Sequence, residues 1–272
     1  MRSLSPRPAK EVLFLEEFPE VSGCGDAVIL FIKERGGVFL ERDESQTAEP
    51  GFVLVNAFDL PDAWFQLLYK IFDNGRVYTV ERGSFAGTRR LEFDFVVVRV
   101  SSPGKRPLVP DIPPDISVPA PSDTGYAEEY FARYLMSAER AETEQYTYGE
   151  RIVPGVEKVL EMYRRDGYGT NQACIEVARP EDIDLEDPPC LRLVDTRIRS
   201  GRLHFYVYFR SWDLWGGLPT NLAGLQLVKE YMASELGVED GTITACSKGL
   251  HLYEYAWEWA KLRIRKREQA AE

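Results

Sequence analysis

The chain has 272 residues, of which 44% are hydrophobic and 28% charged, and this balance is typical of a globular protein with one large domain or one domain plus a small appendage. Its formal net charge of −11 argues against a protein that covers nucleic-acid phosphates, so we expect no DNA partner. No apolar run reaches the roughly 18 to 20 residues of a spanning helix. The N-terminal sequence holds no apolar stretch long enough for a signal peptide. We therefore expect a cytoplasmic protein without a membrane partner.

The cysteines Cys24, Cys174, Cys190 and Cys246 stand far apart in the sequence, without a CxxC pair. This spacing indicates neither a zinc site nor a disulfide framework. We therefore expect no metal. Taken alone, each cysteine is expected to be a small buried apolar side chain.

Residues 1–60 are interpreted as a small β-containing N-terminal extension whose role the sequence does not reveal. Runs at 27–33, 37–43 and 52–58 have the composition of strands. From Asp62 the apolar spacing becomes helical, which predicts a helix with Asp62 as its N-cap and Gly75 at its C-terminal end. We expect a second domain, 61–272, to begin here.

The rest of the chain alternates between apolar strands and amphipathic helices. Residues 93–100 form a nearly continuous apolar run, which predicts a strand buried on both faces. The proline-rich segment 103–121 predicts a loop. Further helices are predicted at 126–142, 153–167 (with Pro154 in the first turn) and 221–237, and further strands at 173–178, 190–211 (a hairpin turning at Ser200-Gly201) and 241–248. The sequence therefore predicts an α+β fold with one large mixed or antiparallel sheet flanked by helices.

A series of short motifs runs through the second half of the chain. Pro189-Cys190 opens the predicted hairpin and Arg210-Ser211-Trp212-Asp213 ends it; Gly-Leu-Pro-Thr-Asn at 217–221 then leads into a helix, and His251-Leu252-Tyr253 follows. In this order the motifs are similar to those of the thymidylate synthase family. The segments WFQLLYKIFDNG, ERGSFAGT and YTYGERI resemble the family's first helix, its phosphate-binding arginine loop and its Tyr-Gly motif. The resemblance covers roughly residues 62–260, is closest to the archaeal branch, and makes 61–272 a thymidylate synthase-like catalytic domain.

The resemblance implies a methyltransferase that converts dUMP to dTMP with a methylene-pterin donor, either 5,10-methylenetetrahydrofolate or methylenetetrahydromethanopterin. Carbon 5 of uracil is a poor nucleophile until carbon 6 is attacked, and a thiolate is suited to that attack. Cys190 would be the attacking thiolate. We expect Arg210, across the hairpin, to lower the pKa of Cys190 by its positive charge.

Other motif residues are expected to hold the nucleotide. Arg82, Arg210 and Ser211 would bind the phosphate, since a guanidinium fork matches phosphate oxygens; Arg89 and Arg90, close behind Arg82, leave the choice of arginine open. The Asn221 carboxamide would pair with the O4 and N3–H edge of uracil, or would simply cap its helix. Asp213 would lie behind the base in the same network.

His251 and Tyr253 share one face of an extended segment and would bond the ribose hydroxyl, while His204 is expected to be an ordinary strand residue. The base that removes the proton from carbon 5 would be Glu129, or else Glu128, with Tyr148 as its partner. The alternative for these adjacent glutamates is a solvated helix surface.

The chain departs from the family on the phosphate and pterin sides. Asn171 and Gln172 replace an arginine pair that the family's second subunit contributes, so charge is expected from Arg151, Arg164 or Arg179. Leu191 replaces the usual histidine, and the closing C-terminal extension of the bacterial and eukaryotic forms is not matched, which is compatible with a tetrahydromethanopterin-type donor. We expect a homodimer that packs the large sheets back to back, burying one face of 93–100 or 203–209. Two alternatives stay open: a dUMP or dCMP hydroxymethylase, and an inactive nucleotide-binding homologue.

Overall fold

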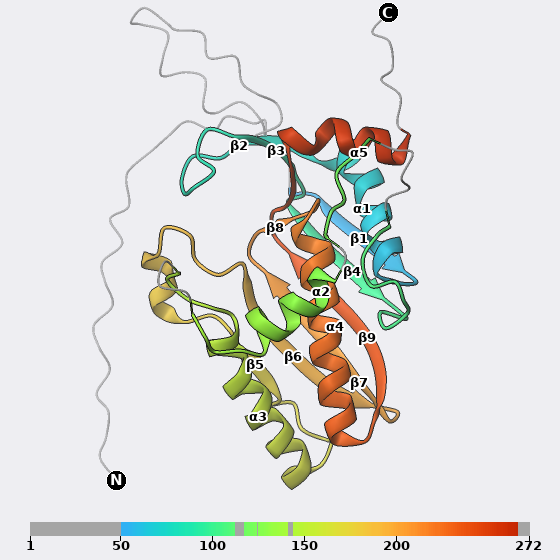
Figure 1. Ribbon diagram of the computed structural model, residues 1–272, viewed down its shortest axis with the longest axis vertical. Helices are drawn as coiled ribbons and strands as arrows, with labels where there is room; N and C mark the ends of the chain where they lie inside the picture. Colours follow the sequence, from blue (N-terminus) through green and yellow to red (C-terminus); the bar gives the residue numbers. More distant parts are fainter. Residues whose placement is uncertain (1–49, 112–116, 124, 141–143, 266–272) are drawn as a thin grey trace, which may run out of the picture. The chain divides into compact units, whose positions relative to one another are not determined.

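A computed structural model describes residues 50–111, 117–123, 125–140 and 144–265 (Figure 1). The strands expected at 27–33 and 37–43 lie outside the described residues. The main sheet is mixed and six-stranded, in the order β1-β4-β9-β7-β6-β5, with β1 parallel to β4 and β7 parallel to β9. Its strands are β1 (Phe52–Ala57), β4 (Phe95–Val100), β5 (Cys174–Glu176), β6 (Leu191–Arg199), β7 (Arg202–Phe209) and β9 (Glu239–Ser247). The α+β prediction with a mixed sheet is confirmed.

The strand at 52–57, which the sequence analysis placed in the N-terminal extension, is an edge strand of this main sheet. All six of its residues pair with β4, from Phe52 opposite Phe95 to Ala57 opposite Val100. It therefore lies in the same compact unit as the rest of the described chain. The division of the chain into 1–60 and 61–272 stays a prediction, because residues 1–49 are outside the described part.

A smaller four-stranded sheet has the order β2-β3-β10-β8. It comprises β2 (Arg76–Thr79), β3 (Arg89–Glu92), β8 (Trp212–Asp213) and β10 (Leu250–Tyr253). Strand β8 directly follows β7, and β10 directly follows β9, so two neighbouring strands of the main sheet continue into the smaller one. The chain segments that connect the two sheets, around Ser211 and Lys248, meet where the candidate site lies.

Helices cover one face of the main sheet (Figure 1). Helix α4 contacts β7 and β9, and α3 contacts β5. Alternate residues of β7 and β9 point toward these helices and are buried, including Phe205, Val207 and Ile243. The described helices and the π-helix η2 are α1 (Leu60–Asn74), α2 (Tyr126–Glu129), η2 (Tyr130–Leu135), α3 (Gly149–Asp166), α4 (Gly217–Leu236) and α5 (Trp257–Ile264), with short 3₁₀ turns η3 (Pro180–Asp184) and η4 (Glu254–Ala256).

The opposite face of the main sheet, called here the open face, carries no described helix. It presents two kinds of side chain. A row of mostly apolar residues crosses the strands through Leu54, Val97, Cys246, Tyr208 and Leu193. Toward the β6–β7 hairpin the face becomes basic. Strand β4 was expected to be buried on both faces; here Arg99 is exposed and Val97 half-buried, because only one face of the strand packs against described elements.

Three expected helix boundaries were wrong. The N-cap of α1 is Asp59, whose carboxylate accepts the backbone N–H of Asp62 at 3.0 Å. The helix expected over 126–142 ends at Leu135 in a π-helical turn. Helix α3 starts at Gly149, so Pro154 lies inside it. Packing requires a glycine at this start, because a Cβ on Gly149 would come within 1.7 Å of the Ser137 carbonyl oxygen. Elsewhere the hairpin turn at Ser200 (φ 51°) and Gly201 (φ 72°) is confirmed.

No helix in the described part of the chain combines the length and apolarity needed to cross a membrane.

The close approach at Gly149 gives a stability prediction. Gly149→Ala should lower the free energy of unfolding by about 3 kcal/mol, because the new methyl group overlaps backbone that cannot rotate away. Gly169→Ala is the matched control, since a Cβ there meets nothing within 4 Å. Urea denaturation followed by circular dichroism measures both; equal midpoints for the two variants would contradict the packing shown here.

Candidate active site

A cavity of about 410 Å³ lies where the two sheets join, and it collects most of the residues singled out from sequence. They come from the β2–β3 loop, the start of β6, the β7–β8 junction and β10. The expected site residues that line it are Arg82, Cys190, Arg210, Ser211, Asp213, His251 and Tyr253. Three expected residues do not line it: Glu129, Tyr148 and Asn221.

Cys190 is held from both sides through its backbone. The hydroxyl of the half-buried Tyr148 accepts the N–H of Cys190 at 3.1 Å and the N–H of Leu191 at 3.2 Å. On the other side, the Cys190 carbonyl accepts the backbone N–H of Arg210 at 2.8 Å. The Arg210 guanidinium also donates to the carbonyls of Pro188 and Pro189. The position of the thiol is therefore fixed by both the start of α3 and the end of β7.

The expected lowering of the Cys190 pKa is wrong. Burial raises the pKa of the thiol, and the positive charge of Arg210 opposes that rise only in part. The neutral thiol is therefore favoured at neutral pH.

The cationic end of the cavity continues into a neighbouring space of about 620 Å³, and Arg82, Arg90, Arg210 and Ser211 border both. Arg90 forms an ion pair with Glu92. Neither Arg82 nor Arg210 is ion-paired with a described residue, so their charge is available to an anion. The sequence did not single out Arg90, since three arginines stand close together in that segment; only the pairing of β3 with β10 brings Arg90 opposite Tyr253.

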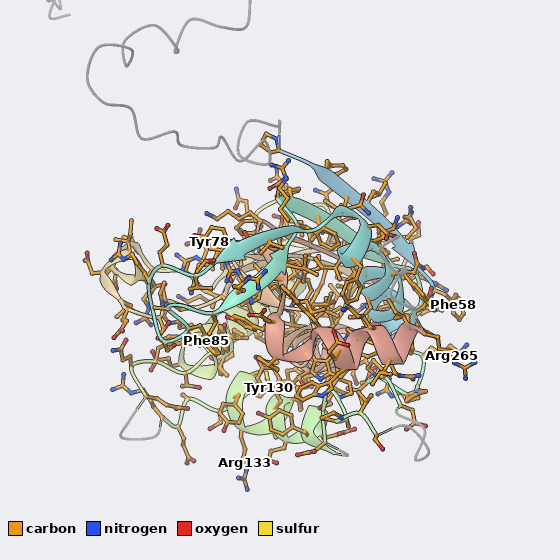
Figure 2. The ribbon with its side chains drawn as sticks, turned by 90° about the horizontal axis from the view of Figure 1, so that it is seen from above. Phe58, Tyr78, Phe85, Tyr130, Arg133 and Arg265 are labelled. Carbon is orange, nitrogen blue, oxygen red and sulfur yellow. The ribbon has the colours of Figure 1, made fainter. Side chains whose placement is uncertain are left out.

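The loop between β2 and β3 covers the cavity. Gly83 has φ +84° and lies so close to Asp187 that a Cβ would come within 2.9 Å of its carboxylate. Ser84 donates a hydrogen bond to Asp187 at 2.8 Å, and Phe85 stacks on Tyr253 with ring centroids 4.7 Å apart. Figure 2 shows Phe85 on the loop that extends from the sheet carrying Tyr78. The loop thereby places Arg82 in the lining of the cavity that Cys190 also lines.

His251 offers the cavity a hydrogen-bond acceptor. Its Nδ1 lies 2.9 Å from the Gly249 carbonyl, which can only accept, so Nδ1 carries the proton. Its Nε2 is then unprotonated, and this buried atom has no partner among the described residues. Burial, together with the positive charge of Arg90, lowers the pKa of His251 to about 3. The ring therefore stays neutral and can accept a hydroxyl proton.

Asp213 ends β8, and its side chain reaches forward to the start of α4. The Asp213 carboxylate accepts the backbone N–H groups of Trp215, Gly216 and Gly217, at 3.2, 3.0 and 2.9 Å. Burial raises the pKa of Asp213 despite these three donors.

Asn221 lies inside helix α4, where it is not an N-cap. It accepts from Trp212 Nε1 at 3.0 Å and donates to the Tyr130 hydroxyl at 2.9 Å. Each end of the carboxamide keeps one further hydrogen-bonding position.

The expected proton-transfer glutamates are not brought to the cavity. Glu129 forms an exposed ion pair with Arg133 at 3.1 Å, and Figure 2 shows Arg133 pointing outward at the periphery. Glu128 is also exposed. Instead, Asp187 borders the cavity beside Cys190. Sequence reasoning missed Asp187, although it precedes the Pro-Pro-Cys motif directly.

Two of the three arginines suggested for the missing charge pair are already neutralised. Arg151 is buried and forms an ion pair with Asp182 at 2.8 Å. Arg164 forms an ion pair with Glu235 at 2.7 Å. Arg179 is exposed.

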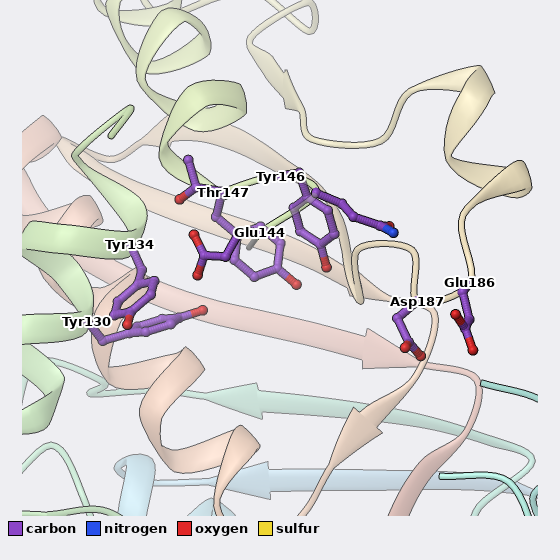
Figure 3. A pocket seen from close by; sticks show the side chains of 9 residues that line it. Tyr130, Tyr134, Glu144, Tyr146, Thr147, Glu186 and Asp187 are labelled. Atoms are coloured by element: carbon purple, nitrogen blue, oxygen red, sulfur yellow. The ribbon is translucent and has the colours of Figure 1, made fainter. Parts of the chain in front are cut away.

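A second cavity of about 450 Å³ adjoins the first through Tyr146 and Asp187, which line both. Figure 3 shows Tyr130 and Tyr134 on one side, Glu186 and Asp187 on the other, and Glu144 and Tyr146 between them. Burial raises the pKa of Tyr146 to about 12, so its hydroxyl remains a proton donor. Aromatic planes with carboxylate acceptors suit a flat ring that carries N–H donors. No cluster of three or more metal-binding side chains occurs among the residues described.

Comparison with known proteins gives consistent matches. The model of the family described as thymidylate synthase matches residues 135–272. A protein named "Putative thymidylate synthase" from Methanosarcina acetivorans is 32% identical over 214 residues, covering 75% of this chain and 91% of the relative. A protein of the same name from Methanothermobacter thermautotrophicus is 32% identical over 220 residues, covering 75% and 94%. A "Deoxyuridylate hydroxymethyltransferase" from Bacillus phage SP01 is 41% identical over 71 residues, covering 26% and 18%.

The environment of Cys190 predicts its reactivity. Its rate of alkylation by iodoacetamide should rise with a midpoint above pH ~8.5, the value of an unperturbed thiol. Arg210→Gln should move that midpoint higher, because Arg210 is the main group that lowers the pKa, and Arg192→Gln should move it less. Mass spectrometry of the Cys190 peptide, with Cys190→Ser as the background control, measures the rates. A wild-type midpoint below pH ~8 would contradict the dominance of burial.

Proposed function

The chain belongs to the thymidylate synthase family, and we propose that it catalyses the reductive methylation of dUMP to dTMP. The observation that carries the proposal is the convergence on one cavity of a fixed thiol, two uncompensated guanidinium groups and a neutral imidazole acceptor. These groups match the three parts of a pyrimidine nucleoside monophosphate: ring, phosphate and sugar hydroxyl.

The phosphate would bind at the cationic end. Arg82 and Arg210 offer guanidinium forks, and Ser211 adds a hydroxyl where the two adjoining spaces meet. Arg210 would then have two tasks, since it also anchors the carbonyls that precede Cys190. Binding of the phosphate and placement of the thiol are thereby coupled through one side chain.

Neutral side chains would form the hydrogen bonds to the sugar and the base. The unprotonated Nε2 of His251 would accept the ribose hydroxyl proton, with Tyr253 beside it. Asn221 does not line the cavity as it stands, so its carboxamide would have to reach the O4 and N3–H edge of uracil with the positions that Trp212 and Tyr130 leave free, while Asp213 holds the start of α4. These neutral side chains would favour a ligand with a sugar hydroxyl and a uracil edge, and they would add no charge to the part of the site that holds the sugar and the base.

The Cys190 thiol would lose its proton to water, with Arg210 stabilising the thiolate, and the thiolate would attack carbon 6 while the C5–C6 π electrons pass to the ring as an enolate. The proton on carbon 5 would pass to a carboxylate through water. Glu129 with Tyr148 remains our assignment for that step, and it requires the α2–η2 segment to turn Glu129 inward from its ion pair with Arg133. Release of Cys190 from carbon 6 completes the cycle.

The second cavity would hold the methylene-pterin, which supplies the one-carbon unit and the hydride. Tyr130, Tyr134 and Tyr146 offer stacking surfaces, and Asp187 offers an acceptor for an amino group at the boundary with the Cys190 cavity. These residues fit the ring of either 5,10-methylenetetrahydrofolate or methylenetetrahydromethanopterin.

A second candidate, favoured by the local identity to the phage deoxyuridylate hydroxymethyltransferase, is hydroxymethylation of the same nucleotide. Water would then replace the hydride in the last step. The residues around Cys190 would have the same roles in both reactions.

The purified full chain should release tritium from dUMP labelled at carbon 5 when a methylene-pterin is supplied. Cys190→Ser should release no more than the background, because Cys190 is the only cysteine among the described residues that line the cavity. Cys174→Ser, on the edge strand β5 and outside the apolar row of the open face, is the control that should retain release. The product mass distinguishes a methyl from a hydroxymethyl group. Wild-type release equal to that of Cys190→Ser with both pterins would refute the catalytic proposal.

We also propose that the chain forms a homodimer through the apolar part of the open face. Leu54 is 52% exposed and Phe52 64% exposed there, although both are large apolar side chains on a regular strand. Exposed apolar surface of this kind marks an interaction site.

Sedimentation velocity should show a dimer at micromolar concentration. Leu54→Glu should shift it toward monomer, since a charge would be buried without a partner. Leu262→Glu on α5 is the matched control, being 58% exposed on another surface. A monomeric wild type, or equal behaviour of both variants, would contradict this interface.

A further inference from the structure

The carboxamide of Asn221 is held between two aromatic side chains from distant parts of the chain. Trp212, in β8, donates from Nε1 to Oδ1 of Asn221 at 3.0 Å. On the other side, Nδ2 of Asn221 donates to the Tyr130 hydroxyl at 2.9 Å. An indole N–H can only donate, so the oxygen of the carboxamide has to face Trp212 and its nitrogen has to face Tyr130. The two contacts therefore fix which end of the carboxamide points where.

Both aromatic partners are held by their own packing. Trp212 is buried, and its ring stacks on Phe209 with centroids 4.2 Å apart. The buried ring of Tyr130 lies against α4 at Gly224, where a Cβ would come within 2.6 Å of it. Gly224 is three residues after Asn221 and so shares its helix face. Turning the carboxamide over would set two donors, its NH₂ group and the Trp212 N–H, against each other in a packed site.

The fixed orientation gathers hydrogen-bond donors at the Tyr130 end. Nδ2 of Asn221 keeps one N–H. The Tyr130 hydroxyl accepts from Nδ2, so its own proton is left to donate, and no acceptor for that proton occurs among the described residues. Burial raises the pKa of Tyr130, and the nearby Cys190 adds to the rise, so the hydroxyl stays protonated. At the Trp212 end, Oδ1 of Asn221 keeps one acceptor position.

The proposed reaction decides which end of the carboxamide meets position 4 of the pyrimidine. Carbon 6 would lie at Cys190, and carbon 5 would face the pterin in the second cavity. The substituent on carbon 4, the next ring atom, would then lie toward that cavity, and N3 would lie farther from it. Tyr130 lines the second cavity, whereas Trp212 lines neither that cavity nor the one at Cys190. The donor end would therefore meet the substituent at position 4, and the acceptor end would meet N3.

Uracil and cytosine have opposite hydrogen-bonding patterns at these two positions. Uracil has an acceptor, O4, and a donor, N3–H. Cytosine has an amino donor at position 4 and an acceptor at N3, so each contact would set donor against donor or acceptor against acceptor. A polar group that is left unpaired in a closed site is costly, and a site built around such groups rejects the wrong ligand strongly.

We propose that Trp212 and Tyr130 lock the orientation of the Asn221 carboxamide, that the Tyr130 hydroxyl adds a second donor to O4, and that the locked site selects uracil over cytosine. Trp212 acts through Asn221 and is a positioning residue. The inference rests on the proposed function, from which it takes the place of the pterin, and it adds the residues that decide the base. It concerns nucleotide binding, the step that precedes proton transfer.

Isothermal titration calorimetry of the purified full chain, with dUMP and dCMP as the probes, tests the proposal. Wild type should bind dUMP at least about tenfold more tightly than dCMP. Tyr130→Phe keeps the ring and removes the hydroxyl, so it should weaken dUMP about fivefold without weakening dCMP. Tyr163→Phe is the matched control. Tyr163 is also buried, its hydroxyl is hydrogen-bonded to Thr196 at 2.9 Å outside the site, and its variant should keep the wild-type preference.

Trp212→Phe gives a readout that a structural role would not produce. It keeps an aromatic ring on Phe209 but removes the N–H that orients Oδ1 of Asn221. The carboxamide can then turn over and offer Oδ1 to the amino group of cytosine. We expect Trp212→Phe to bind dCMP severalfold more tightly than wild type, a gain that damage to the fold cannot cause. The thermal stability of every variant is measured alongside.

Two results would overturn the proposal and leave the reaction standing. One is equal binding of dUMP and dCMP by wild type. The other is a ratio of the two affinities that either variant leaves at the wild-type value, even if both affinities fall together, since that contact would then be structural only. Failure of wild type to bind either nucleotide at millimolar concentration would refute the nucleotide site and the proposed function with it. Tritium release from dUMP by wild type is measured separately and tests the reaction alone.

Discussion

The Tyr148 hydroxyl, which accepts two backbone N–H groups at the start of β6, is the interaction on which the geometry of the site depends. It connects the first turn of α3 to the strand that presents Cys190. Its placement requires α3 to start at Gly149, where only a glycine can pack against the Ser137 carbonyl. The Tyr-Gly motif therefore has a structural role. Gly149 allows the start of α3 to pack against the Ser137 carbonyl, and Tyr148 then holds the backbone of Cys190.

Burial dominates the electrostatics around this nucleophile. The Cys190 thiol and the Asp213 carboxyl have raised pKa values and the His251 imidazole has a lowered one, so each group is shifted toward its neutral form. The permanent charge comes from guanidinium groups, which cannot neutralise themselves by losing a proton. A site of this kind suits a ligand whose charge is concentrated in one phosphate and whose remaining parts are neutral. The reaction then needs only one transient anion, at Cys190 and carbon 5, beside Arg210.

The open face shows how one sheet can serve several purposes. The helix-covered face of the main sheet supplies the core. Strands β7 and β9 of the sheet lead into β8 and β10, which carry site residues. The exposed side is divided into an apolar row through Leu54 and Val97 and a basic region around Arg197.

The sequence by itself determined the α+β class, the Ser200-Gly201 hairpin, and the set of residues around Cys190. These features depend on local periodicity, turn chemistry and motif order, which a linear chain displays directly. Tertiary structure decided the rest. Asp59 replaced Asp62 as a cap because α1 begins where the chain leaves β1. Helix packing gave Asn221 a partner in Tyr130, and Glu129 forms an ion pair with Arg133. Pairing of the distant strands β3 and β10 brought Arg90 to the site, and the loop before β6 brought Asp187. The direction of the Cys190 pKa shift was also set by tertiary structure. Sequence shows the neighbouring charge, but only the folded chain shows how completely water is excluded from the thiol.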